Sequence, residues 1–267
     1  MQKPINPLRE PVPKEVPLEN APLLRVIGQI RFPLIEKINS GQAIAQFQEA
    51  VRSLFPILRE ESLPQFILSP NGPTRGADLK TWKFQSIEGD WLLSLTSSFV
   101  ALETEKYTSR ADFVSKLQSI YSNLDAAFNI PIIDRIGLRY IDRIEFSKIE
   151  ELLDLTSQEV LGILATPIAE DAELTIQENL FSFAEIEGRM RARWGVVPPN
   201  TTIDPTVIEP SKKRTWILDL DSYSTPKKRY SETELKNTLE KFAEKSYSVF
   251  RWIVSDNFLR RYGGDPC

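Results

Sequence analysis

The clearest hydrophobic pattern in the chain predicts a helix between residues 109 and 129. Ser109 and Asp112 are typical of a helix N-terminus, because their side chains accept hydrogen bonds from free backbone N–H groups. Behind them, apolar residues recur every three or four positions: Phe113, Leu117, Ile120, Leu124 and Phe128. This spacing places them on one face of an amphipathic helix that packs on a core.

Three further segments have helical spacing. A shorter helix is expected to end near Pro56, with apolar positions at Ile44, Phe47, Val51 and Leu54. Another begins at Ser147, with Glu150 in capping-box spacing. A long final helix begins at Ser231 with Glu234 in the same spacing, and its stripe comprises Leu235, Leu239, Phe242, Val249 or Phe250, and Ile253.

Runs rich in β-branched and aromatic residues predict strands on both sides of the 109–129 helix. Before it they are Leu24–Phe32, Gln65–Ser69, Leu79–Ile87 and Trp91–Ala101. After it they are Arg135–Phe146, Leu174–Ile186, Gly188–Val197 and Arg214–Asp221. The short polar turn Glu88-Gly89-Asp90 predicts that two of the early strands form a hairpin.

The same order of elements occurs twice, which predicts an internal duplication of a β-α-β-β-β-α unit. Residues 21–130 and 131–267 are the two halves, and Phe84-x-x-Ile87-Glu88-Gly89 matches Phe183-x-x-Ile186-Glu187-Gly188. We expect an α+β fold in which the halves join one curved antiparallel sheet with the long helices on one face. This element order resembles those of the TATA-binding protein fold and of helix-grip folds, and it implies no function.

Two proline-rich segments interrupt this pattern. Residues 1–20 carry prolines at positions 4, 7, 11, 13 and 17 and predict an extended arm, which either packs on its own domain or contacts a partner. Pro198–Pro210, with four prolines, predicts a long loop between the last two strands.

Composition narrows the chemistry. The 267 residues include no histidine and a single cysteine, Cys267, which excludes histidine-based triads, HExxH zinc sites and disulfides within the chain. The sequence also lacks the common phosphate-binding glycine loops, so we expect no cofactor. The apolar stretch Trp91–Leu102, which is free of charge, is shorter than a membrane span, and we expect a cytoplasmic protein without a membrane partner.

Arginine-rich strands are the first candidate binding site. Strand alternation places Arg189, Arg191 and Arg193 on one face, opposite Met190, Ala192 and Trp194. The same spacing groups Arg135, Arg139 and Arg143. Together they would bind an anionic ligand, a nucleic-acid backbone or an acidic partner surface; alternatively they form a solvated face paired with Asp219 and Asp221.

Those two carboxylates are the only metal candidates that the sequence offers. Asp219 and Asp221 share one strand face, a geometry that holds Mg²⁺ in phosphoryl-transfer enzymes. Cross-strand salt bridges with the arginines explain the pair more simply, so these residues are weak metal candidates.

Five segments together carry a resemblance: VIGQIRF (26–32), Trp91–Thr104, RIGLRYIDRI (135–144), LDLD (218–221) and FRWIVSD (250–256). The sequence resembles a sporadically distributed, uncharacterised bacterial protein family of similar length, over residues 20–263. The resemblance supplies no catalytic residue. It implies an accessory system of the defence or toxin–antitoxin kind.

These observations favour a non-catalytic binding or adaptor protein that contacts a partner protein. The first alternative is binding of a nucleotide or nucleic acid on the arginine face; the second is a magnesium-dependent phosphoryl-transfer or nuclease activity. The C-terminal stretch Val249–Gly263 is denser in aromatic residues than one packed stripe requires, which fits either contacts with a partner or a second copy of the chain, or a deeper core.

Overall fold

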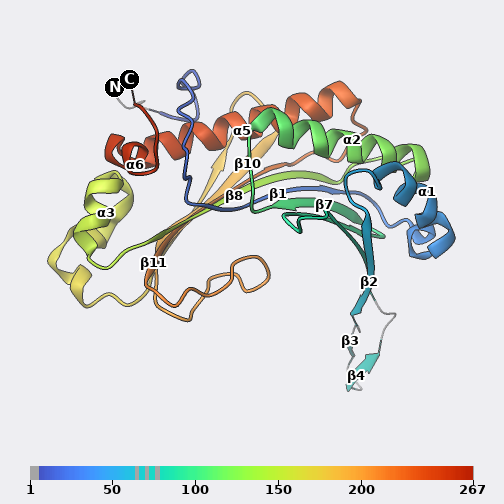
Figure 1. Ribbon diagram of the computed structural model, residues 1–267, viewed down its shortest axis with the longest axis horizontal. Coiled ribbons are helices and arrows are strands. Elements are labelled where there is room, and N and C mark those ends of the chain that lie inside the picture. Colours follow the sequence, from blue (N-terminus) through green and yellow to red (C-terminus); the bar gives the residue numbers. More distant parts are fainter. Residues whose placement is uncertain (1–5, 64–65, 70–71, 76–78, 267) are drawn as a thin grey trace. The chain divides into compact units, whose positions relative to one another are not determined.

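The computed structural model describes residues 6–63, 66–69, 72–75 and 79–266 (Figure 1). The strands are β1 (Leu23–Arg31), β2 (Ile57–Leu63), β3 (Phe66–Ser69), β4 (Gly72–Arg75), β5 (Leu79–Gln85), β6 (Trp91–Thr96), β7 (Phe99–Thr104), β8 (Arg135–Glu145), β9 (Thr175–Ser182), β10 (Gly188–Val197) and β11 (Thr215–Ser224). The α-helices are α1 (Gly41–Val51), α2 (Arg110–Phe128), α3 (Ile149–Leu155), α4 (Gln158–Leu161), α5 (Glu232–Ile253) and α6 (Asp256–Arg261).

The fold is α+β, as the sequence predicts. Within the described residues, nine antiparallel strands form one sheet in the order β2-β5-β6-β7-β1-β8-β11-β10-β9, and β3 pairs with β4 in a separate ribbon. The chain divides into two compact units. Unit 1 comprises residues 1–25, 139–223 and 241–267, and unit 2 comprises residues 26–138 and 224–240.

In unit 2, helix α2 packs directly on strand β1. A Cβ atom added to Gly28 of β1 would lie 2.5 Å from Cδ2 of Leu117 and 2.9 Å from Cε1 of Phe113, both on α2. Glycine at this position therefore permits the close approach of helix and strand. The ring of Phe47 on α1 meets the ring of Phe84 on β5 edge to face, with centroids 5.5 Å apart, and completes the core.

One strand prediction in unit 2 is wrong. The run Trp91–Ala101 is a hairpin of two strands, β6 and β7, and not one continuous strand. Its turn contains no glycine or proline; instead the hydroxyl of Thr96 accepts hydrogen bonds from the backbone N–H groups of Ser98 and Phe99, at 3.2 Å each. Threonine and serine stabilise such turns by bonding to the local backbone, which makes the turn difficult to see in a hydrophobic pattern.

The first predicted half also contains more strands than the three expected. Six strands, β2 to β7, lie between α1 and α2. Strand β2 was missed because its sequence, ILREESL, is mostly charged or polar, and it forms an edge of the sheet beside β5. Of the predicted strand Gln65–Ser69, residues 66–69 form β3, and Gln65 lies outside the described residues.

The predicted helix starts are confirmed at α2 and α5. Ser109 accepts a hydrogen bond from the N–H of Asp112. Ser231 and Glu234 form a reciprocal capping box, in which Oγ of Ser231 accepts from the N–H of Glu234 at 3.2 Å and Oε2 of Glu234 accepts from the N–H of Ser231 at 2.9 Å.

The expected start of the helix after β8 needs a correction. The N-cap of helix α3 (Ile149–Leu155) is Lys148, one residue later than the predicted Ser147, so Glu151 replaces Glu150 as the capping side chain. Its Oε1 accepts from the N–H groups of Ser147 and Lys148, at 3.1 and 3.3 Å. The backbone donors near the helix start therefore still have a carboxylate partner.

The arm of unit 1 packs on its own unit over the residues that the structure describes; residues 1–5 lie outside them. Nζ of Lys245 donates to the carbonyl of Leu8 at 2.8 Å, and Tyr247 accepts from the N–H of Val16 at 2.8 Å. Both partners belong to α5. Prolines hold the arm extended, and its free backbone groups bond to side chains of the helix.

Candidate functional site

The predicted alternation along β10 is confirmed. Met190, Ala192 and Trp194 are buried, whereas Arg189 is exposed and Arg191 and Arg193 are half-buried. Cross-strand register with β9 places Leu180 beside Arg191 and Ser182 beside Arg189. We call the side of β8, β11, β10 and β9 that carries Arg139, Asp219, Arg193 and Leu180 the arginine face.

Asp219 joins two of the predicted arginines. Arg139 donates from Nε to Oδ1 of Asp219 at 2.7 Å and from Nη2 to Oδ2 at 3.0 Å. Arg193 donates to the same Oδ2 from Nε at 2.9 Å and from Nη2 at 2.5 Å. The Asp219 side chain is 1% exposed, so both of its oxygens are occupied in a region shielded from water.

A second carboxylate reaches the pair from a loop. Oδ2 of Asp204 lies 2.8 Å from Nη2 of Arg139 and 3.6 Å from Nη2 of Arg193. Its other oxygen, Oδ1, accepts from the hydroxyl of Thr206 at 2.7 Å. Two arginines and two aspartates therefore form one cluster with no net formal charge, which we call the Arg–Asp cluster.

The ionisation of the cluster follows from these contacts. Burial alone would lower the pKa of Arg139, but hydrogen bonds and charges from Asp219 and Asp204 outweigh burial and raise it. Burial would raise the pKa of Asp204, but hydrogen bonds from Thr206 and Arg139 and the charge of Arg139 lower it. Arg139 and Asp204 are thus held in their charged forms at neutral pH.

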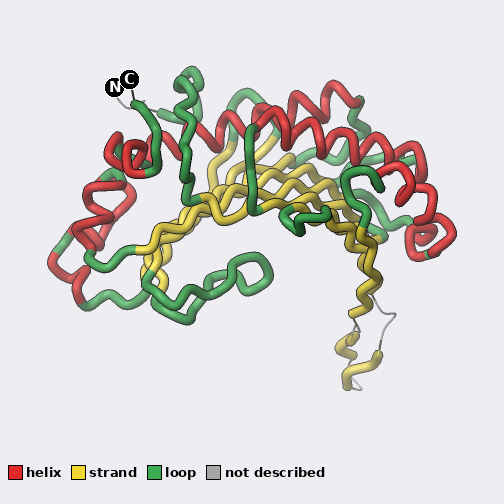
Figure 2. The backbone as a smooth tube through the Cα atoms, in the orientation of Figure 1, coloured by secondary structure: helices red, strands yellow, loops and turns green. Residues whose placement is uncertain are grey.

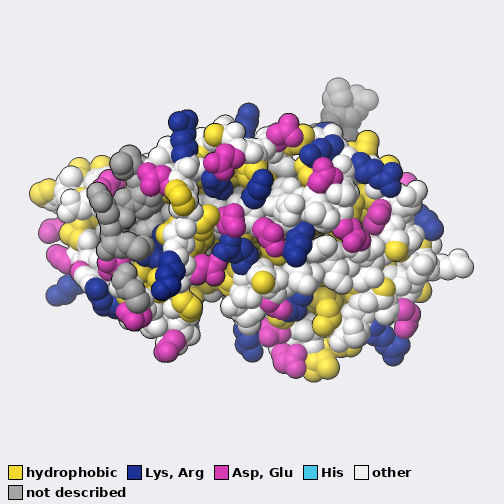
Figure 3. Space-filling view, turned by 90° about the horizontal axis from the view of Figure 1, so that it is seen from above, with side chains coloured by type: hydrophobic (Ala, Val, Ile, Leu, Met, Phe, Trp, Pro, Cys, Tyr) yellow, Lys and Arg dark blue, Asp and Glu magenta, His cyan; other side chains and the backbone are white. Residues whose placement is uncertain are grey.

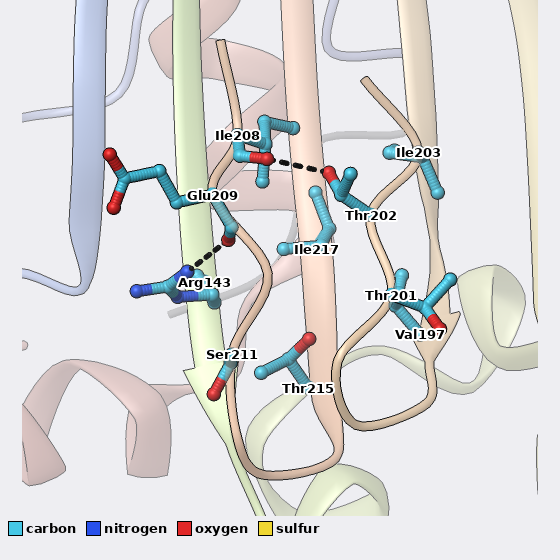
Figure 4. A pocket seen from close by; sticks show the side chains of 10 residues that line it. All are labelled: Arg143, Val197, Thr201, Thr202, Ile203, Ile208, Glu209, Ser211, Thr215 and Ile217. Carbon is cyan, nitrogen blue, oxygen red and sulfur yellow. Dashed lines mark hydrogen bonds between the residues drawn. The ribbon is translucent and has the colours of Figure 1, made fainter. Parts of the chain in front are cut away.

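The loop that carries Asp204 spans residues 198–214, between β10 and β11, and is neither helix nor strand throughout (Figure 2). Its limbs pass on either side of Ile217 of β11, with Thr202 near β10 and Ile208 nearer β8 (Figure 4). Thr202 donates to the carbonyl of Ile208 at 2.7 Å and ties the limbs together. The hollow between loop and sheet leaves no enclosed space for a molecule as large as water.

The other predicted arginines lie outside the cluster. Nη1 of Arg143 donates to the carbonyl of Glu209 in the 198–214 loop at 3.0 Å (Figure 4). Nη2 of Arg191 lies 3.7 Å from Oδ2 of Asp221, and the Arg191 side chain is 38% exposed. Arg135 is half-buried and belongs to unit 2.

The two metal candidates share a strand face, as the sequence predicts. Asp219 is buried and Asp221 is half-buried on β11, two positions apart. Each contacts an arginine, and both oxygens of Asp219 accept hydrogen bonds from guanidinium groups. Within the described ranges, no group of three or more Asp, Glu, His or Cys side chains is arranged to hold a metal ion.

Sequence analysis missed the exposed apolar edge of the sheet. Strand β9 is the last strand of the sheet in unit 1, and its residues Ile176 and Leu180 are 40% and 57% exposed. Both lie on the arginine face, because they pair with Gly195 and Arg191 of β10. The sequence signal for this face was the spacing of Ile176, Glu178 and Leu180 at every second position of a strand. Only the strand register shows that these residues adjoin the arginines of β10.

Asp142 on β8 is a second residue that the sequence did not single out. It is 6% exposed, and burial raises the pKa of its carboxyl to about 7. Burial of Tyr262, the residue that follows α6, raises the pKa of its hydroxyl, and the charge of Asp142 raises it further. At neutral pH, Asp142 is therefore a buried and partly protonated carboxyl.

Charges of both signs are mixed on the surface seen in Figure 3. Lys and Arg side chains there lie among Asp and Glu side chains, and neither sign forms a continuous patch. This mixture is unlike the continuous basic surface typical of proteins that coat nucleic acid.

Neither a membrane-spanning helix nor a known relative identifies a function for this chain. None of the helices described is long and apolar enough to cross a bilayer. The sequence matches no protein-family model and no curated protein.

Proposed function

We propose that the protein is a non-catalytic binding or adaptor protein that contacts a partner protein through the β9 edge of unit 1. The observation that carries the proposal is the exposure of two large apolar side chains, Ile176 and Leu180, on the edge strand of the sheet. An edge strand offers unpaired backbone N–H and C=O groups, and apolar side chains beside it add buried area when a partner strand joins.

The surroundings of this edge favour a protein partner. Leu180 lies beside Arg191, which is 38% exposed, and the next arginine, Arg189, is exposed beside Ser182. Aromatic, apolar and arginine side chains in one patch are typical of protein interfaces. The resemblance to a bacterial family implies an accessory system of the defence or toxin–antitoxin kind, and we propose that the adaptor acts there in the cytoplasm.

The experiment compares variants in co-purification from the native host at moderate salt, followed by mass spectrometry. We expect one stoichiometric protein with the wild type, strongly reduced with Leu180→Asp. Ile87→Asp is the matched control, because Ile87 is 77% exposed in unit 2. Equal recovery of the same proteins with all three chains would refute a β9 interface. Light scattering on the purified chain distinguishes a homodimer from a different partner.

Nucleotide or nucleic-acid binding is the second candidate, and the exposure of Arg189 and Arg191 supports it. It predicts that binding weakens as salt rises, because phosphate contacts release counterions. It also predicts a loss of affinity in Arg189→Ala and Arg191→Ala. Arg139 and Arg193 add less than the sequence suggested, because Asp219 and Asp204 neutralise them.

A magnesium-dependent phosphoryl-transfer or nuclease activity receives less support. Guanidinium groups already occupy both oxygens of Asp219 and would repel a cation nearby. The hypothesis still makes a sharp prediction, which is that Mg²⁺ raises the melting temperature of the wild type but not of Asp221→Asn.

We also propose that residues 21–130 and 131–267 arose by duplication. The strand order supports this, since β5-β6-β7-β1 and β9-β10-β11-β8 follow the same internal order. The matched motifs lie in corresponding hairpins, with Gly89 between β5 and β6 and Gly188 at the start of β10. A duplicated curved sheet of this kind would have the element order of TATA-binding protein or helix-grip folds.

A further inference from the structure

The Arg–Asp cluster joins a rigid element to a loop. Arg139, Arg193 and Asp219 all belong to strands, whereas Asp204 belongs to the 198–214 loop. The three strand residues bond to one another by four hydrogen bonds of 3.0 Å or less. The strand residues would therefore stay in place if the loop moved, since their mutual contacts do not involve it.

The strand residues alone leave one positive charge unbalanced. Arg139 and Arg193 carry two positive charges, Asp219 carries one negative charge, and the arginine side chains are only 13% and 12% exposed. A poorly solvated net charge is unfavourable without a counter-ion. Asp204 supplies one negative charge through a single oxygen shared by the two guanidinium groups.

The remaining contacts of the loop are mostly polar and near water. Lys213 and Ser211 contact the carboxylate of Glu145 at 2.8 and 3.1 Å, and their side chains are on the surface. Surface contacts of this kind stabilise a structure weakly. Ile208, 3% exposed, is the main apolar anchor (Figure 4).

We infer that Arg139 and Arg193 form a carboxylate-binding site, and that Asp204 occupies it as an internal ligand until an acidic side chain of the partner replaces it. The inference rests on the proposed function for the identity of the ligand. A monoanionic carboxylate fits the one unbalanced charge, whereas a phosphate dianion would exceed it. Arginine binds carboxylates through its planar fork of donors, as Arg139 does with Asp219 here.

Two further arginines lie on the approach to the site, together with Glu178 of β9, which pairs in register with Arg193. Arg191 and Arg189 precede Arg193 on the same face of β10, and both are more exposed than Arg193. An acidic segment bound along the β9 edge would meet these two arginines first. Its carboxylate would then compete with Asp204, which is 20% exposed and so reachable from water.

Chemical rescue tests the site without any partner. Asp204→Ala removes the internal carboxylate, and acetate at constant ionic strength and pH 7 replaces it. We expect Asp204→Ala to melt at a lower temperature than the wild type in chloride, and acetate to restore several degrees with saturation. Phosphate should restore less than acetate. Asp204→Asn is the second variant, because its amide oxygen can still accept from Thr206.

Two controls make the rescue specific. Asp221→Ala removes a carboxylate that lies 3.7 Å from Arg191, and acetate should not raise the melting temperature of this variant above its value in chloride. In the double variant Arg193→Met with Asp204→Ala, the rescue should disappear. Equal melting of Asp204→Ala and of Asp204→Asn in acetate and chloride, or rescue that persists in the double variant, would overturn the inference.

Exchange in the wild type tests displacement. A glutamate-rich octapeptide should speed amide hydrogen exchange of Thr206 and Asn200, whose N–H groups bond to Asp204 Oδ1 and to the carbonyl of Ser211. A lysine-rich octapeptide should not. Unchanged exchange with both peptides shows a permanent ion pair and refutes displacement. A missing partner in the co-purification would refute the proposed function while leaving the acetate result intact.

Discussion

Asp219 and Arg139 form a two-point contact between strands, with Nε–Oδ1 and Nη2–Oδ2 distances of 2.7 and 3.0 Å. This geometry uses the planar guanidinium and the planar carboxylate together, which makes it stronger and more directional than a single hydrogen bond. It fixes the long side chain of Arg139 on the arginine face, where Arg193 completes the arrangement.

Asp219→Asn should strongly destabilise the protein. The substitution leaves two poorly solvated guanidinium groups with only Asp204, and breaking a buried ion pair by removing one partner costs roughly 3–5 kcal/mol. Urea unfolding measures the free-energy change. Asp221→Asn is the control on the same strand face, because Asp221 lies 3.7 Å from one arginine, Arg191, and makes no two-point contact with it, so its loss should cost less than that of Asp219. Similar losses in both variants would show that the cluster adds no special stability.

Gly28→Ala should loosen the packing of α2 on β1. The added methyl group would meet Leu117 at 2.5 Å and Phe113 at 2.9 Å, so helix or side chains must move, at a cost of roughly 1–3 kcal/mol. Gly41→Ala is the matched control, since nothing lies within 4 Å of its added Cβ. At Gly41 the helix propensity of alanine should raise stability by about 0.5–1 kcal/mol. Thermal unfolding of both variants gives the comparison, and a neutral Gly28→Ala would contradict it.

Asp142 should make stability fall as pH rises. The pKa of its carboxyl is about 7 in the folded chain and near 3.8 when solvated, so the folded state holds the proton more tightly. Its contribution is fully present below about pH 4, decreases from there and is lost as pH passes 7. A difference of about three pH units corresponds to roughly 4 kcal/mol between the two ends of this range.

Asp142→Asn checks the origin of this dependence. An amide keeps the shape of the side chain but cannot ionise, so the variant should be more stable than the wild type at pH 8 and should differ little at pH 4. Urea unfolding across pH 4–8 measures both. Parallel pH profiles for the two proteins would mean that Asp142 does not titrate with folding. Glu145→Gln is a useful comparison, because Lys213 lowers the pKa of Glu145, and its effect on pH dependence has the opposite sign.

Gly195→Ala should separate β9 from β10. An added Cβ would lie 1.7 Å from the carbonyl oxygen of Thr175, which is a backbone atom and cannot rotate away. We expect the amides of β9 to lose protection from hydrogen exchange while those of α2 keep it. Gly162→Ala is the control, because its φ of 54° strains an L residue by roughly 1–3 kcal/mol but its added Cβ has open space. Retained β9 protection in Gly195→Ala would contradict the prediction.

The spacing of apolar residues predicted the long helices and strands, because each of these elements buries one face and therefore repeats apolar residues at a fixed interval. The stripes of α2 and α5 and the strands β1, β8 and β10 all lie within a few residues of their predicted positions. It missed β2, whose residues are largely exposed, and it merged β6 with β7, whose turn depends on one threonine hydroxyl. Edge strands and tight turns carry little hydrophobic signal.

The site was predictable only in part. Alternation placed Arg189, Arg191 and Arg193 on one face, and the sequence already named Asp219 and Asp221 as alternative partners for arginines. It could not show that Asp204, 65 positions after Arg139, completes the cluster, because a loop without periodicity gives no register. Strand pairing between distant segments decides such contacts.

The division of the chain into units also constrains the order in which the protein folds. Unit 1 begins with residues 1–25, is interrupted by most of unit 2, and is completed only by residues 241–267. The carbonyl of Leu8 bonds to Lys245 and the N–H of Val16 bonds to Tyr247, so the arm is synthesised long before the helix that supplies its partners. Closure of unit 1 therefore occurs late in folding and depends on contacts of high sequence separation.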